Sequence, residues 1–421
     1  MTAVGTVGRR YTTAEETCDL AVLVNEFPRL SETFVLGDLL GLEAAGTRLH
    51  IFSLRQPEVE LAHEAVEHLR APVEYLPEFS GRQRRLLLRA IQAALFLRDP
   101  RGFARGLAEI YASPDYSRSR LEQALLLARR LDRIGSPPLY VHFAHKPATI
   151  GRFAALLLGS PFAISAHAVD VWTTPVPELR AKFRDAQLVL CCYEESRDYV
   201  RQIANGTTRV ELAPHGVVIP PQPAREEESP PVLLSVGRLV EKKGFDTLIT
   251  AARAMRDRGL DFQVRIAGDG PLWPNLQRLV GELDLADTVR FVGPLTAQEL
   301  EPHYAAAAAF VLACRVGSDG NRDGLPNTVL EAMARGLPVV STTLASVEEA
   351  IIDGEHGLLA PPDDHTALAM ALERLLNDPQ LRSKLGSAAR ARVLERYDRD
   401  ALASHVHTLL GSVGMIGAVR S

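Results

Sequence analysis

The sequence lacks the long apolar run that a membrane-spanning helix requires. Its longest apolar stretches, such as residues 305–314, fall well short of the roughly 18 residues needed to cross a bilayer. Residues 1–20 include Arg9, Arg10 and several acidic side chains where a secretory signal would have an apolar core and a small-residue cleavage site. Neither a membrane anchor nor a secretion signal is expected.

Cysteine is scarce, with four in 421 residues and no C-x-x-C spacing. The neighbouring pair Cys191 and Cys192 is a poor basis for a disulfide or a zinc site. We expect a reduced chain in the cytoplasm, without a bound metal ion.

Positive charge is not in excess, because 47 lysines and arginines face 52 acidic residues and the net charge is −5. A protein that coats nucleic acid needs clustered cations to neutralise phosphates. Nucleic acid is therefore not an expected partner.

Short apolar strands alternate with helical segments in two blocks, and the length suits two or three domains. The strands expected in the first block are residues 19–25, 49–54, 139–143, 162–166 and 188–192. Those in the second block are residues 232–236, 263–267, 289–292, 309–313 and 338–341. Between the blocks, residues 220–231 are rich in proline and glutamate and are expected to form a linker.

Such continuous apolar strands, separated by helices, predict an α/β fold of two Rossmann-like, doubly wound parallel-sheet domains. Ligands of open parallel sheets bind beyond the carboxyl ends of the strands, so the two domains are expected to face a central cleft. The P-loop, H-E-x-x-H and G-x-S-x-G motifs are absent from the sequence, and Gly268-x-Gly270 lacks the third glycine of a dinucleotide fingerprint.

A cationic turn, residues 237–244, follows the first strand of the second block and precedes a helix. A helix N-terminus offers unpaired N–H groups and a positive dipole end, so Arg238 and Lys243 beside it suit a diphosphate. The alternative is a solvated surface loop.

A second element places Asp323 ahead of a helix expected over residues 326–335, with Glu331 two turns into that helix. Pro326 falls in the first turn, where proline is tolerated. The two carboxylates and the free N–H groups at the start of the helix can contact three different portions of one ligand. The alternative is that Asp323 caps the helix while Glu331 is an ordinary buried or surface residue.

Four ordered motifs resemble the donor domain of retaining glycosyltransferases of family 4, which have the GT-B fold. These are Ser235-Val236-Gly237-Arg238-Leu239 with Lys243-Gly244, Ala267-Gly268-Asp269-Gly270-Pro271-Leu272, Asp323-Gly324 through Leu330-Glu331-Ala332-Met333-Ala334, and Gly336-Leu337-Pro338-Val339-Val340. In the first block, residues 25–34 resemble the N-terminal loop of the exopolysaccharide branch, including colanic-acid-type enzymes. Residues 165–170 resemble a strand-end motif whose histidine contacts the donor sugar.

This resemblance implies roles for individual residues. Arg238 and Lys243 would bind the diphosphate and stabilise its developing charge, Asp323 would lie near the donor sugar, and His167 would cap that sugar from the other domain. Glu331 would accept hydrogen bonds from the ribose hydroxyls. The implied catalytic residues are His167, Asp323, Arg238 and Lys243, and the implied donor-binding residues are Gly237, Arg238, Lys243, Asp323, Gly324, Leu325, Asn327 and Glu331.

The sequence departs from the family pattern in three places. Asp323 stands where relatives have glutamate, Pro326 supplies no N–H, and residues 25–28 lack the paired glycines of many relatives. The acceptor side is assigned to Glu26, Ser31 and Glu32.

A basic, apolar helix expected from residue 81 carries Arg82, Arg84, Arg85, Arg89 and Arg98, with Arg101 and Arg105 beyond it. Residues 81–105 either lie on an anionic membrane or pack on the first domain with their arginines in water.

The expected activity is retaining transfer of a hexose from a nucleoside-diphosphate sugar to a hydroxyl of a glycan or lipid-linked acceptor, in cell-surface polysaccharide synthesis. Neither a metal nor a cofactor is needed. The alternatives are a catalytically degenerate partner subunit and a sugar-nucleotide epimerase. The expected domains are residues 1–219 with 397–421 and residues 232–396, joined by 220–231.

Overall fold

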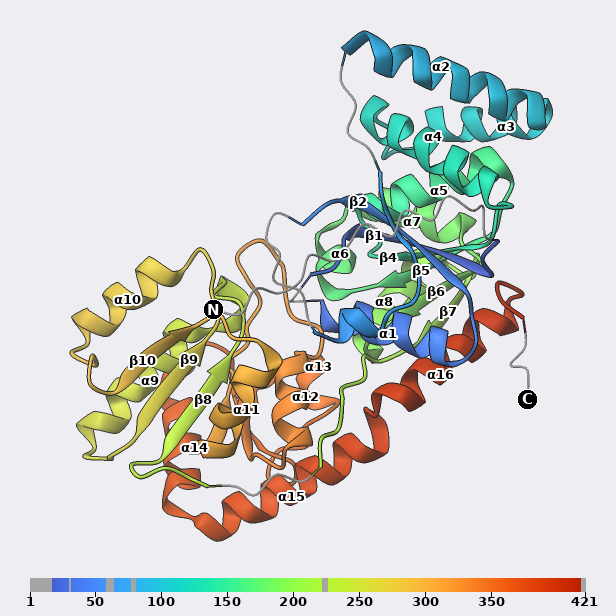
Figure 1. The fold of residues 1–421 in the computed structure, drawn as a ribbon. Coiled ribbons are helices and arrows are strands. Elements are labelled where there is room, and N and C mark those ends of the chain that lie inside the picture. The colour runs from blue at the N-terminus through green and yellow to red at the C-terminus, as the bar shows by residue number, and fades with distance from the viewer. Residues whose placement is uncertain (1–16, 30–31, 58–63, 77–80, 222–225, 418–421) are drawn as a thin grey trace. The chain divides into compact units, whose positions relative to one another are not determined.

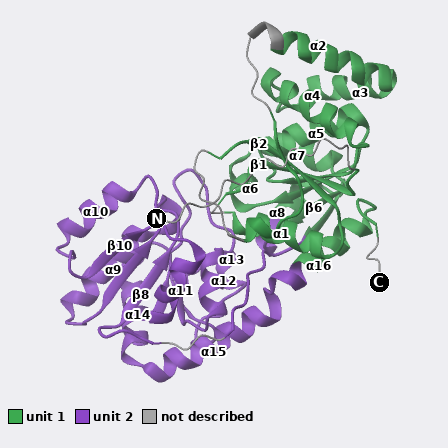
Figure 2. Cartoon of the chain, in the orientation of Figure 1, with its two compact units in different colours: residues 1–191, 197–211, 403–421 green, residues 192–196, 212–402 purple. Residues whose placement is uncertain are grey.

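The computed structural model describes residues 17–29, 32–57, 64–76, 81–221 and 226–417 (Figure 1). They form two compact units, shown in Figure 2: residues 1–191, 197–211 and 403–421, and residues 192–196 with 212–402. Ser31 lies outside the described residues. No helix in the described ranges is long and apolar enough to span a membrane.

The first unit is built on a sheet of order β3-β2-β1-β4-β5-β6-β7. Its strands are β1 (Leu20–Glu26), β2 (Leu49–Arg55), β3 (Val73–Tyr75), β4 (Leu139–His142), β5 (Phe162–Ala166), β6 (Leu188–Cys191) and β7 (Arg209–Leu212). The pairs β1–β2, β1–β4, β4–β5 and β5–β6 are parallel. Side chains along the central strands are buried, as expected for a parallel sheet covered on both faces.

Helices fill the crossovers of this sheet. They are α1 (Thr33–Ala44), η1 (Glu64–His68), α5 (Lys146–Leu158), α6 (Ala168–Thr173), α7 (Val176–Asp185) and α8 (Glu194–Ala204). Between β3 and β4 the chain adds α2 (Gly81–Arg98), α3 (Pro100–Tyr111) and α4 (Arg118–Arg133). These three helices extend the same hydrophobic core, because Leu88, Phe103 and Leu125 are buried in it.

The second unit contains a sheet of order β10-β9-β8-β11-β12-β13. Its strands are β8 (Val232–Val236), β9 (Gln263–Ala267), β10 (Val289–Gly293), β11 (Ala307–Val311), β12 (Val339–Thr342) and β13 (Leu358–Ala360). Its helices are η2 (Glu241–Lys243), α9 (Phe245–Asp257), α10 (Trp273–Glu282), α11 (Ala297–Ala306), α12 (Asn327–Ala334), α13 (Ala345–Glu348), α14 (His365–Asn377) and α15 (Pro379–Arg396). The expected α/β fold with two Rossmann-like parallel sheets is confirmed.

The strand order places a topological switch point at the centre of each sheet. In the second unit the chain runs outward from β8 through β9 to β10 and then returns to add β11 on the other side of β8. The loops that follow β8 and β11 therefore leave in opposite directions, and ligands of open parallel sheets bind beyond strand ends of this kind. The corresponding pair in the first unit is β1 and β4.

The unit boundaries differ from those expected from the sequence. The described part of residues 220–231 belongs to the second unit, because the Glu226 and Glu228 N–H groups bond to the Ala305 and Ala306 carbonyls. Glu227 also pairs with Arg382 at 2.9 Å. The last helix, α16 (Arg399–Ser412), crosses into the first unit from Ala403 onward.

Candidate functional site

The loop after β8 carries the cationic turn, and its path is set by close backbone packing. The Gly237 N–H bonds to the Ala267 carbonyl, and the Leu239 N–H bonds to the Asp269 carbonyl at 2.9 Å. Gly268 permits this contact, since a Cβ there would lie 1.9 Å from the Gly237 carbonyl oxygen and its φ is +140°. The close packing at Gly268, in the motif of residues 267–272, thus holds the cationic turn in place.

Lys243 ends η2, directly before the first turn of α9. Gly244 follows it with φ +63°, and a Cβ at Gly244 would lie 1.8 Å from the Ala313 carbonyl oxygen. This close approach brings the start of α9 against the segment that leaves β11. The two loops at the switch point are therefore in direct contact.

Asp323 is buried in the loop between β11 and α12 and pairs with two lysines. Its Oδ2 lies 2.7 Å from Lys243 Nζ, and its Oδ1 lies 3.0 Å from Lys242 Nζ. The Asp323 carbonyl accepts a hydrogen bond from the Ser346 hydroxyl at 3.2 Å. Asp323 does not cap α12, because the residue before that helix is Pro326. The helix begins at Asn327, one residue later than expected.

Asp323 and Lys243 shift each other's pKa values. Burial alone would raise the pKa of Asp323, but its pairing with Lys243 and Lys242 outweighs burial and lowers that pKa. Burial likewise would lower the pKa of Lys243, yet the adjacent Asp323 carboxylate raises it. Both groups are therefore charged at neutral pH, and the lysine pair exceeds the aspartate by one positive charge.

Glu331, on α12, is held by two neighbouring side chains. The Tyr304 hydroxyl on α11 donates a hydrogen bond to Glu331 Oε2 at 3.3 Å. Arg335 donates to the Glu331 carbonyl at 2.8 Å, and its guanidinium lies 4.5 Å from the centre of the Tyr304 ring. Burial raises the pKa of Glu331, and Arg335 and Tyr304 act against that rise.

The other residues expected to bind the donor lie on the same two loops. Arg238 is exposed, and within the described part of the chain its guanidinium has no ion-pair partner. Leu325 packs against the hydrophobic core of the second unit, and Asn327 is the first residue of α12. The structure therefore brings Lys243 and Asp323 into contact, while Arg238 remains open to solvent.

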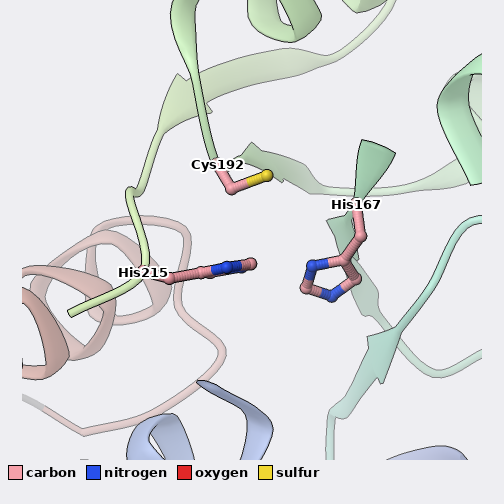
Figure 3. Close-up of side chains that lie close together, drawn as sticks. All are labelled: His167, Cys192 and His215. Atoms are coloured by element: carbon pink, nitrogen blue, oxygen red, sulfur yellow. The ribbon is translucent and has the colours of Figure 1, made fainter. Parts of the chain in front are cut away.

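In the first unit, His167 directly precedes α6, at the end of β5 (Figure 3). Its ring centre lies 4.8 Å from that of Phe34 on α1 and 4.5 Å from that of Phe143 after β4. The His167 N–H donates to Asp170 Oδ1 at 2.9 Å, and the Ala144 N–H donates to Oδ2. Burial raises the pKa of Asp170 to about 7, against these N–H donors, which favour its charged form.

The residues expected on the acceptor side are only partly described. Glu26 ends β1, and Glu32 precedes α1 and pairs with Arg29 at 3.1 Å. Burial raises the pKa of Glu32, although Arg29 opposes that rise. Ser31 falls among the residues that are not described.

Potential metal ligands in the second unit include Cys192 and His215, whose ligand atoms lie within 4.8 Å of each other (Figure 3). Zinc sites use three or four protein ligands. The Cys192 thiolate and the His215 imidazole are both ligand types that zinc accepts.

Sequence reasoning missed Lys242 and Tyr304. Lys242 stands beside Lys243, so the doubled lysine was visible, but only the fold shows that both ammonium groups reach one carboxylate. Tyr304 belongs to an alanine-rich segment with no motif that would link it to Glu331.

A sequence profile described as "Glycosyl transferases group 1" matches residues 221–392 of this chain. A "Putative colanic acid biosynthesis glycosyltransferase WcaL" from Salmonella typhimurium is 27% identical over 406 residues, covering 92% of this chain and 98% of the relative. A "GDP-mannose-dependent alpha-(1-6)-phosphatidylinositol monomannoside mannosyltransferase" from Mycolicibacterium smegmatis is 31% identical over 266 residues, covering 59% of this chain and 70% of the relative.

Two solved structures share the fold across both units. Sucrose-phosphate synthase from Thermosynechococcus elongatus has a TM-score of 0.71 at 20% identity, covering 94% of this chain and 98% of that one. Anabaena Alr3699/HepE, in complex with UDP-glucose, has a TM-score of 0.69 at 17% identity, covering 93% and 99%.

Proposed function

This chain belongs to the glycosyl transferases group 1, and from that membership and the geometry of its second unit we propose that it is a retaining glycosyltransferase with a nucleoside-diphosphate hexose as donor. The observation that carries this proposal is the convergence of Lys242, Lys243 and Asp323 at the switch point of a parallel sheet. Two lysines against one aspartate leave a net positive charge beside the start of α9, which suits an anionic ligand.

In this proposal, Lys243 and the exposed Arg238 bind the diphosphate. During transfer, the bond between the anomeric carbon and the diphosphate oxygen breaks, and negative charge builds up on that oxygen. The acceptor hydroxyl oxygen bonds to the anomeric carbon on the face that the diphosphate leaves, and the hydroxyl proton passes to the departing diphosphate. A lysine held by a buried carboxylate is already in place to stabilise this charge, so it need not reorganise. Asp323 positions Lys243 and lies near the sugar, and the reaction needs neither metal nor cofactor.

Glu331 accepts hydrogen bonds from the ribose hydroxyls through the carboxylate oxygen that Tyr304 leaves available. The rest of the donor site is formed by the backbone of Gly237, Gly324, Leu325 and Asn327. His167 contacts the sugar, and Glu26, Ser31 and Glu32 contact the acceptor.

The acceptor in this proposal is a hydroxyl of a glycan or a lipid-linked sugar in cell-surface polysaccharide synthesis. The name of the Salmonella typhimurium relative supports that process, because it refers to colanic acid biosynthesis. We place the enzyme in the cytoplasm, where its four free cysteines would stay reduced.

The test is a donor screen followed by one substitution. Thermal shift with UDP, GDP and their sugars identifies the donor, and transfer is then followed by NMR, which also reports the anomeric configuration of the product. We expect Lys243→Ala to reduce transfer by about 10²–10³-fold, the usual effect of losing one preorganised electrostatic donor. EDTA should leave the wild-type rate unchanged.

Lys384→Ala is the matched control, because this lysine lies on α15 outside the site. It should transfer sugar at the wild-type rate. Normal transfer by a folded Lys243→Ala variant would refute the assignment, and a chain that binds neither UDP nor GDP would be a partner subunit instead of an enzyme.

A further inference from the structure

The helix α2 has a composition unlike that of an ordinary surface helix. Its 18 residues, Gly81–Arg98, contain five arginines and no acidic side chain. Surface helices usually mix both signs of charge, which pair along the helix. A helix with only positive charges attracts an anionic surface.

One face of α2 packs on the protein. Leu88, Ile91 and Leu95 are buried, and they recur at the spacing of one helical stripe. On the same side, Arg84 pairs with Glu122 of α4, and Arg98 lies 3.2 Å from Asp132. The sequence left open that this helix packs on the first domain, and the structure shows such packing for one of its faces.

The opposite face is apolar and faces solvent. Leu86, Ala90, Ala93 and Leu97 recur at intervals of four, three and four residues, so they share one stripe, and all are exposed. Leu86 is 59% exposed and Leu97 is 78% exposed. We call these four residues the apolar ridge.

A basic edge runs beside the apolar ridge. Arg85 and Arg89 are exposed one turn apart, and among the described side chains neither has an ion-pair partner. Phe96 follows on the same edge and is 47% exposed. Leucines at the centre with arginines and an aromatic ring along one side form the pattern of a helix that lies in a membrane interface.

The position of α2 leaves this face accessible within its unit. In Figure 1 it is the outermost helix, with α3 and α4 between it and α5. We propose that the apolar ridge and the basic edge dock on the surface of an anionic lipid bilayer. The leucines enter the headgroup region while the arginines extend toward lipid phosphates.

A second copy of this chain is the other occupant to consider. A two-fold contact through α2 would bring identical surfaces together, so Arg85 and Arg89 of one copy would face those of the other. That repulsion favours the bilayer. Docking does not depend on sugar transfer, so it is tested without a donor.

The test is sedimentation of the full chain with phosphatidylcholine vesicles that do or do not contain phosphatidylglycerol. We expect binding only to the anionic vesicles, weakened by added salt, which screens the charges. Arg85→Gln with Arg89→Gln should lower vesicle affinity about thirtyfold, the combined effect of two arginines near a charged surface. Leu86→Gln with Leu97→Gln should lower it at least about tenfold.

Matched controls come from exposed residues of the second unit. Arg374→Gln with Arg396→Gln removes the same charge, and Met370→Gln with Leu394→Gln removes similar exposed apolar area. Both should bind anionic vesicles like wild type. Circular dichroism and donor thermal shift show that each variant is folded.

Three results would overturn the proposal. These are equal binding to neutral and anionic vesicles, equal loss of affinity in the control variants, or a wild-type dimer in light scattering that Leu86→Gln with Leu97→Gln dissociates.

Discussion

The Tyr304 hydroxyl donates to Glu331 Oε2 at 3.3 Å, so a residue of α11 fixes a carboxylate of α12. The tyrosine is itself held, because Arg335 lies over its ring and pairs with Glu301. Glu331 therefore has little freedom to rotate. If it binds ribose as proposed, this hydrogen bond sets the direction of the remaining acceptor oxygen.

Tyr304→Phe should weaken nucleoside-diphosphate binding about threefold to tenfold, because it removes one hydrogen bond while keeping the ring. Calorimetry with ribose and deoxyribose nucleotides distinguishes this role from general stability. In the variant, the ratio of the affinity for ribose nucleotides to the affinity for deoxyribose nucleotides should fall. A merely structural role of Tyr304 would lower both affinities equally. Tyr397→Phe, at another buried tyrosine of the second unit, should leave the preference unchanged.

Asp323→Asn should lower the free energy of unfolding by about 3 kcal/mol, because it leaves two lysine charges near each other in a buried site. Urea denaturation at neutral pH measures this loss. Asp323→Glu keeps the negative charge and should lose less than half as much. Equal stability of Asp323→Asn and wild type would show that the lysines do not need this carboxylate.

Gly268→Ala should both destabilise the second unit and weaken donor binding. Its Cβ would meet the Gly237 carbonyl oxygen at 1.9 Å, so the cationic turn must move. Overpacking of this kind costs about 1–3 kcal/mol. Gly281→Ala is the control, since it lies in α10 with no atom within 4 Å of the new Cβ and should be neutral or slightly stabilising. Unchanged donor affinity in Gly268→Ala would contradict the supporting role of this loop.

The sequence predicted the central strands closely because their apolar runs are continuous. Residues 162–166, 232–236 and 263–267 have the expected bounds. The short strands β3, β7 and β13 were missed, since three or four residues carry little periodic signal. The strand expected at 309–313 begins instead at Ala307, because the preceding alanine run fits a helix or a strand equally well.

The residues of the site, like the strands, were predicted only where the sequence carries a strong local signal. Asp323 and Lys243 were predicted from motifs, because each stands at a strand-to-helix junction that the sequence marks with glycine. Their contact was not predicted, since it depends on how two loops 80 residues apart pack at the switch point. The contacts of Tyr304 with Glu331 and of Lys242 with Asp323 could be recognised only from the fold, for the same reason.

Asp38, on α1, predicts a pH dependence of stability in the first unit. Burial raises the pKa of its carboxyl from 3.8 to about 7. The folded chain then keeps this proton up to about pH 7, whereas the unfolded chain releases it near pH 4. Because the folded state binds more protons between these values, the contribution of Asp38 to stability falls as pH rises from about 4 to 7.

Asp38→Asn mimics the protonated carboxyl and should not show this fall. A pKa raised from 3.8 to about 7 corresponds to a change in the free energy of unfolding of at most about 4 kcal/mol. Since the side chain is partly exposed, water should reduce the difference to about 1–2 kcal/mol. Urea denaturation from pH 4 to pH 8 should therefore show that the free energy of unfolding of the variant rises relative to that of wild type up to about pH 7. Above that pH, the difference between the two should stay constant. Asp261→Asn makes the same substitution at an exposed site and is the control, and an Asp38→Asn variant that stays parallel to wild type from pH 4 to pH 8 would contradict this role of Asp38.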